Sequence, residues 1–129
     1  MKPNETSQLV IGAAMKVHTV LGPGILESAY DACLFYELTK TGLHFEHQVT
    51  LPIVYERVQL ATAYRVDFIV EDVLILELKC VERVQAVHRA QLLSYLRLSG
   101  RKLGLLLNFN VAHMRDGVHR VINGPENEL

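Results

Sequence analysis

The sequence of 129 residues has only two cysteines, Cys33 and Cys80, and no long uninterrupted hydrophobic run. The cysteines have neither the spacing of a zinc site nor the pattern of a disulfide framework, so we expect both to pack in the interior. The longest apolar runs, such as residues 103–107, are too short to cross a membrane, and no signal-peptide pattern is present. We therefore expect a cytoplasmic protein without a membrane partner.

Internal repeats and low-complexity linkers are also absent. The length predicts a single domain over residues 1–129. Half of the residues are hydrophobic (50%), which is enough for a packed core.

The chain has little net charge: 13 Lys and Arg oppose 14 Asp and Glu, leaving −1. Bulk charge therefore does not indicate a nucleic-acid-binding protein. The distribution is uneven, since residues 1–78 carry 5 basic against 10 acidic residues and residues 79–120 carry 8 against 2. A basic half beside an acidic site could hold a phosphate backbone against metal ligands. The alternative is an uneven spread of charge over solvated faces.

Hydrophobic periodicity predicts an α/β protein of mixed architecture. The expected order is two helices, three strands, a helix and two strands: residues 6–21, 25–41, 45–55, 64–70, 73–80, 84–98, 103–109 and 119–122. The strands on either side of the third helix should be parallel, and the first three strands should form an antiparallel meander. We expect residues 124–129 to be frayed.

Three ionisable residues, Asp67, Glu77 and Lys79, lie in an otherwise apolar hairpin. Charges in buried strands are costly unless they are paired or bind a metal. A three-residue turn at residues 71–73 would place Asp67 opposite Glu77, and all three groups would share one face. A two-residue turn would separate the carboxylates. Two oxygen ligands on adjacent strands suit Mg²⁺ or Mn²⁺, and a buried ion pair without a metal is the alternative.

These residues also carry a family resemblance. Asp67 followed by Glu77-Leu78-Lys79 resembles the D…(D/E)xK signature of the PD-(D/E)XK nuclease superfamily. Gly24-Ile25-Leu26-Glu27-Ser28-Ala29-Tyr30 matches the pattern that names the small GxxExxY family of that superfamily, and Gln91-Leu92-Leu93-Ser94-Tyr95 matches the QxxxY motif of its RecB-like branch. The resemblance covers about residues 17–120 and implies a restriction-endonuclease-like core, a mixed β-sheet flanked by helices. The usual proline before the aspartate is absent, and Arg65-Val66 stand there instead.

The resemblance implies roles for the matching residues. Asp67 and Glu77 would bind Mg²⁺ or Mn²⁺, with the Leu78 carbonyl as an extra ligand and Glu27 completing the shell directly or through water. Lys79 would position the nucleophile, and Gln91 would steady Lys79 or the phosphate. The candidates for substrate binding are Tyr95, Arg65 and His88. Glu27 also has a purely structural interpretation, because an acid in the first turn of a helix is favoured by the helix dipole.

We expect a Mg²⁺-dependent nuclease that hydrolyses phosphodiester bonds of nucleic acid, with DNA as the favoured substrate and a homodimer as a possible assembly. The alternative is a catalytically silent nucleic-acid-binding or protein-interaction module with the same fold. A third interpretation is a structural protein with a buried ion-pair network.

Overall fold

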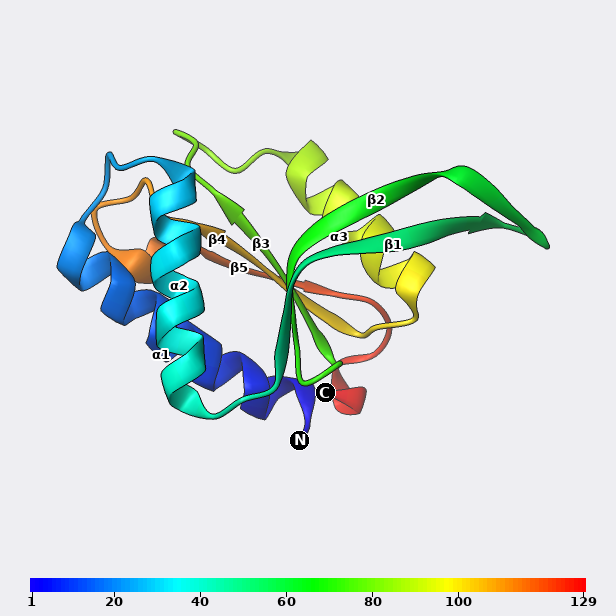
Figure 1. Ribbon diagram of the computed structural model, residues 1–129, viewed down its shortest axis with the longest axis horizontal. Helices are drawn as coiled ribbons and strands as arrows, with labels where there is room; N and C mark the ends of the chain where they lie inside the picture. The colour runs from blue at the N-terminus through cyan, green and yellow to red at the C-terminus, as the bar shows by residue number, and fades with distance from the viewer.

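A computed structural model describes all of residues 1–129 (Figure 1). Helices α1 (Pro3–Leu21) and α2 (Glu27–Thr41) precede strands β1 (Phe45–Tyr55), β2 (Val58–Val70) and β3 (Leu74–Lys79). Helix α3 (Ala86–Ser99) joins β3 to β4 (Leu103–Asn108), and β5 (Val118–Ile122) follows the short 3₁₀ helix η1 (Met114–Gly117). A second 3₁₀ helix, η2 (Glu126–Glu128), ends the chain.

The five strands form one sheet in the order β1-β2-β3-β4-β5. Strands β3 and β4, which flank α3, are parallel, and the other neighbouring pairs are antiparallel. The predicted mixed sheet, its antiparallel meander and its parallel pair are thus confirmed.

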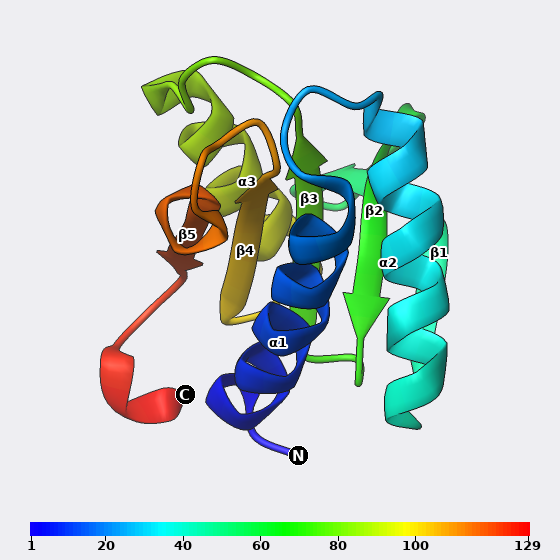
Figure 2. The ribbon, with the colours of Figure 1, turned by 90° about the vertical axis from the view of Figure 1, so that its left-hand side faces the viewer.

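Helices cover both faces of the sheet, with α1 and α2 on one side and α3 on the other (Figure 2). The larger core cluster joins α1 and α2 to alternate residues of the central strands, Leu74, Leu76 and Leu78 of β3 among them. The smaller cluster joins Ile75 and its neighbours to Leu92 and Leu96 of α3. Burial of both faces explains why β3 and β4 are almost wholly apolar.

Gly104 of β4 lets α3 approach the sheet closely. A Cβ atom at this position would lie 2.9 Å from the branched end of Leu92. Such contacts are too short for real carbon atoms, so Leu92 would have to shift for any larger residue at this position.

The first two strands change faces at Gln48. Phe45 contacts the larger cluster, whereas Val49 and Leu51 contact the smaller one. Gln48 has a positive φ of 55°, which is uncommon for a residue other than glycine. The far part of the β1–β2 hairpin then extends away from α1 and α2 (Figure 1). The predicted strand over residues 64–70 is therefore only the inner half of β2.

The expectation of a frayed tail was wrong. Leu129 is buried against the larger cluster, and its carbonyl accepts a hydrogen bond from the Asn4 amide at 3.2 Å. A single leucine after a run of polar residues shows no periodicity, so its burial could not be predicted from the sequence.

Cys33 and Cys80 are free and partly buried against the larger cluster, as expected. None of the helices has the length and apolar character needed to cross a membrane.

Candidate active site

Asp67 and Glu77 lie at a fork between β2 and β3. The two strands pair only from Phe68 with Leu76 to Val70 with Leu74, so the predicted three-residue turn is confirmed. One step beyond the last pair, Asp67 and Glu77 follow on the two strands. The Asp67 carboxylate bridges the fork, because its Oδ2 atom accepts a hydrogen bond from the Leu78 amide at 2.8 Å.

The turn that sets this register is stabilised by a residue outside the hairpin. Glu71 and Asp72 both have positive φ values, 52° and 58°. Arg101 donates to the Asp72 carboxylate at 2.6 Å and to its carbonyl at 3.1 Å. These bonds fix the turn and thereby the alignment of Asp67 with Glu77.

Glu77 is a buried acid with an unsatisfied hydrogen-bond acceptor. Only 8% of the residue is exposed, and its Oε1 atom has no hydrogen-bond partner. Burial first, and then the neighbouring Asp67 charge, raise the pKa of Glu77 to about 9. An unsatisfied buried carboxylate beside a second carboxylate is a site that a cation would stabilise, so these residues fit a divalent metal.

Glu27 is brought toward this fork by the turn between α1 and α2. Gly22 and Gly24 have φ values of 69° and 89°, which form the turn. The Tyr30 hydroxyl donates to the Gly22 carbonyl and accepts from the Ile25 amide, so it fastens the turn at both ends. Burial and the Asp67 charge raise the pKa of Glu27, the first residue of α2. Glu27 therefore lies within electrostatic reach of Asp67.

Lys79 is the last residue of β3, two residues after Glu77. Its positive charge opposes, but does not cancel, the rise in the pKa of Glu77 and of Glu27. Its backbone is anchored by the residue after β4, since the Phe109 amide donates to the Lys79 carbonyl at 3.0 Å. Asn108, only 2% exposed, stands opposite Lys79 in the parallel register. Its side chain bonds both the amide and the carbonyl of Val81 at 3.1 and 2.9 Å. Asn108 therefore holds the segment that leaves the site.

The three site residues predicted on α3 have different surroundings. Tyr95 stacks on Tyr64 with ring centroids 4.4 Å apart, and burial followed by the Glu77 and Asp67 charges raises the pKa of Tyr95. Gln91 is exposed, and no hydrogen bond joins it to Lys79. His88 accepts a hydrogen bond from the Gln85 amide at 3.0 Å at the start of α3.

Arg65 is an exposed residue of β2. It forms no ion pair within the chain, so its guanidinium is available to a ligand from outside.

No three His, Cys, Asp or Glu side chains lie close enough together to hold a metal by themselves. The donors at the fork are therefore two carboxylates, Asp67 and Glu77, with the Leu78 carbonyl as a proposed addition. Mg²⁺ is usually bound by one or two carboxylates and keeps several waters, so this small donor set suits it.

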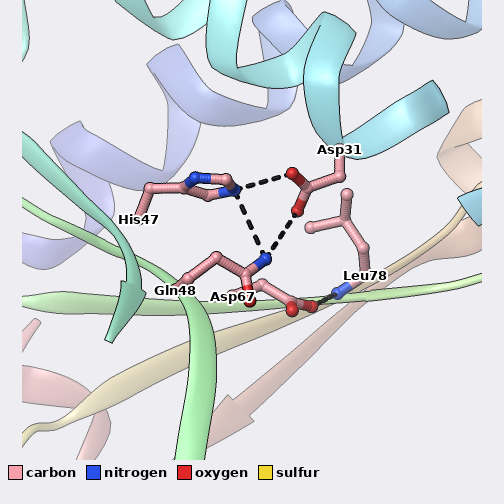
Figure 3. Close-up of polar contacts among 5 residues, drawn as sticks. All are labelled: Asp31, His47, Gln48, Asp67 and Leu78. Carbon is pink, nitrogen blue, oxygen red and sulfur yellow. Dashed lines mark hydrogen bonds and ion pairs between the residues drawn. The ribbon is translucent and has the colours of Figure 1, made fainter. Parts of the chain in front are cut away.

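Three residues that the sequence did not single out border the same site: Asp31, His47 and Gln48 (Figure 3). Asp31 lies one helical turn after Glu27, which was the available signal. His47 and Gln48 are polar residues in a strand, but without the register of β1 nothing in the sequence connects them to Asp67.

A family of known proteins matches nearly the whole chain. Residues 4–121 match the family model described as the PD-(D/E)XK nuclease superfamily. No curated protein matches the sequence. A solved structure called "Crystal structure of SSO0001" is similar over 95% of this chain and 79% of that chain, at 16% identity and a TM-score of 0.46.

Proposed function

This chain belongs to the PD-(D/E)XK nuclease superfamily, and we propose that it is a metal-dependent nuclease that hydrolyses phosphodiester bonds of DNA. We assign it to the GxxExxY branch on the motif from Gly24 to Tyr30, and residues 1–129 would form one nuclease domain. Mg²⁺ or Mn²⁺ is the proposed ion.

The observation that carries the proposal is the Glu77 carboxylate, buried at the fork beside Asp67 with one oxygen unpartnered. Asp67 and Glu77 would hold the ion, joined by the Leu78 carbonyl. When bound, such an ion polarises a phosphate oxygen and makes water a better nucleophile. Glu27 would complete the shell through water, because the three carboxylates do not lie close enough together to hold the ion directly.

The cationic and polar groups around the fork would act on substrate. Lys79, at the end of β3, would orient the attacking water or neutralise charge that develops on the phosphate. Tyr95 would border the scissile phosphate from α3. Gln91, Arg65 and His88 would contact the nucleic-acid backbone, and the excess of basic residues over 79–120 favours such contacts.

The test is cleavage of double-stranded and single-stranded DNA, with RNA in parallel, by purified protein in Mg²⁺. We expect Asp67→Ala to abolish cleavage and Lys79→Ala to reduce it by about 10²- to 10⁴-fold. The matched controls are Asp116→Ala and Lys2→Ala, which change exposed residues outside the fork. Cleavage at the rate of the unaltered protein in both fork variants would come from another site or a contaminant and would end the proposal.

A second candidate function is a binding module without turnover. It is favoured by the pKa of Glu77, since a carboxyl that keeps its proton to about pH 9 can remain buried without any metal. Calorimetric titration with Mn²⁺ separates the two. A folded protein that binds nucleic acid but takes up no Mn²⁺, with or without nucleic acid, would favour the module.

A further inference from the structure

Asp31 of α2 and His47 and Gln48 of β1 form a polar cluster beside the fork (Figure 3). The Asp31 Oδ1 atom lies 2.6 Å from the His47 Nε2 atom, and the pair is only partly exposed. The His47 ring packs on Phe68 with centroids 4.5 Å apart. The imidazole is thus fixed on both sides and holds the Asp31 carboxylate in place.

Asp31 in turn orients the Gln48 side chain. Its Oδ2 atom accepts from Gln48 Nε2 at 3.5 Å, a long hydrogen bond, and the same nitrogen lies 3.4 Å from His47 Nε2. A carboxylate accepts and cannot donate, so it selects the nitrogen of the amide. The amide oxygen of Gln48 must then point away from Asp31.

That oxygen is buried and has no partner. Gln48 Oε1 and Glu77 Oε1 are the two buried side-chain atoms of the chain without a hydrogen bond. Most buried polar atoms in proteins are satisfied, so an orphaned acceptor calls for a donor. Gln48 also lines a hollow of about 290 Å³, together with Glu27, Ser28, Asp31 and Asp67 and with no hydrophobic residue.

The backbone at Gln48 is bent to place this side chain. His47 pairs with Phe68 and Val49 with Val66, so Gln48 stands opposite Asp67. Its φ of 55° lies in the left-handed region, which is unfavourable for a residue other than glycine. The strain lies at the one position of β1 that faces the proposed metal ligand.

We propose that Gln48 is a further positioning residue of the metal site, whose amide oxygen accepts a hydrogen bond from water held by the cation. This inference rests on the proposed function. A hydrated divalent ion brings donors that need acceptors, since Mg²⁺ keeps several of its waters. An amide oxygen supplies an acceptor without adding a further charge to Glu27, Asp31 and Asp67. The Asp31–His47 pair holds the amide nitrogen of Gln48, so the amide oxygen is turned away from Asp31.

The experiment measures Mn²⁺ affinity by calorimetry in the absence of nucleic acid, together with the thermal midpoint of each metal-free variant. Gln48→Met keeps the length of the side chain and removes the acceptor. Gln48→Asn suits the positive φ but withdraws the oxygen. Gln59→Met, at an exposed position of β2, is the matched control.

We expect both Gln48 variants to bind Mn²⁺ about 10- to 100-fold more weakly than the unaltered protein, as for groups that orient metal ligands elsewhere. Gln59→Met should bind normally. If Gln48→Met does not fold, Gln48→Asn decides alone. Normal Mn²⁺ binding by the folded Gln48 variants would overturn the inference and leave the proposed nuclease intact. Failure of the unaltered protein to bind Mn²⁺ would overturn the proposed function and this inference with it.

Discussion

The Asp67 carboxylate accepts a hydrogen bond from the backbone amide of Leu78 at 2.8 Å, across a point where their strands have stopped pairing. This contact takes the place of a backbone hydrogen bond between the two strands. It draws the Asp67 side chain toward β3, where Glu77 precedes Leu78. Two carboxylates are thereby held together in a partly dry environment, an arrangement that is unfavourable without a cation or a proton.

Stability should fall as pH rises when no metal is present. The pKa of Glu77 is raised from its ordinary value of 4.5 to about 9, by burial first and then by the Asp67 charge. Between these values the unfolded chain releases a proton that the folded chain keeps, so the free energy of unfolding should decrease by up to about 1.4 kcal/mol per pH unit. Urea unfolding with chelator at several pH values measures this.

Glu77→Gln should flatten that pH dependence, and it should be more stable than the unaltered protein at pH 8. The control, Glu46→Gln, alters an exposed acid of β1 and should keep the slope. Parallel curves for Glu77→Gln and the unaltered protein would show that Glu77 is already ionised in the fold.

Metal affinity should rise with pH over the same range. A proton on Glu77 competes with the ion. The Mn²⁺ affinity should therefore increase about tenfold for each unit by which the pH is raised, up to about pH 9. Calorimetry at pH 6.5 and 7.5, in buffers of different ionisation enthalpy, should also detect about one proton released. An affinity that does not change with pH would mean that the ion binds without displacing the Glu77 proton.

Removal of the Tyr30 hydroxyl should loosen the turn that presents Glu27. Tyr30→Phe loses the bonds to the Gly22 carbonyl and the Ile25 amide, so we expect a loss of about 1 kcal/mol in the free energy of unfolding. Mn²⁺ binding should weaken as well. Tyr36→Phe, at a tyrosine that is 64% exposed, should change neither quantity. If Tyr30→Phe and Tyr36→Phe have the same stability and the same Mn²⁺ affinity, the Tyr30 hydrogen bonds do not position Glu27.

Substitution of two glycines should have effects of opposite sign. Gly104→Ala places a carbon 2.9 Å from Leu92 and should destabilise the fold by about 1–3 kcal/mol. Gly12→Ala, in α1 with open space around it, should stabilise by about 0.5–1 kcal/mol. Chemical denaturation checks both, and a neutral Gly104→Ala would show that α3 can move away from the sheet.

The hairpin was predictable because its chemistry is local. Glu71, Asp72 and Val73 form a turn whose length alone decides whether Asp67 faces Glu77, and the alternation of side chains does the rest. Helix positions were predictable for the same reason, since Gly22, Gly24 and Gly42 end or separate periodic segments.

The remaining parts of the site depend on distant contacts. Gln48 reaches Asp67 only through the pairing of β1 with β2, and Asp31 meets His47 only because α2 packs against that pair. Asn108 holds the chain after Lys79 from the neighbouring parallel strand. A helix separates those two strands in the sequence, so no local pattern connects them.

The central claim is that Asp67 and Glu77 hold one cation between them. A crystal structure grown with Mn²⁺, with its anomalous scattering recorded, tests it most directly. The account predicts an anomalous peak about 2.1 Å from oxygens of both carboxylates. A well-ordered Glu77 with its Oε1 atom bonded to another protein group, and no peak at the fork, would contradict it.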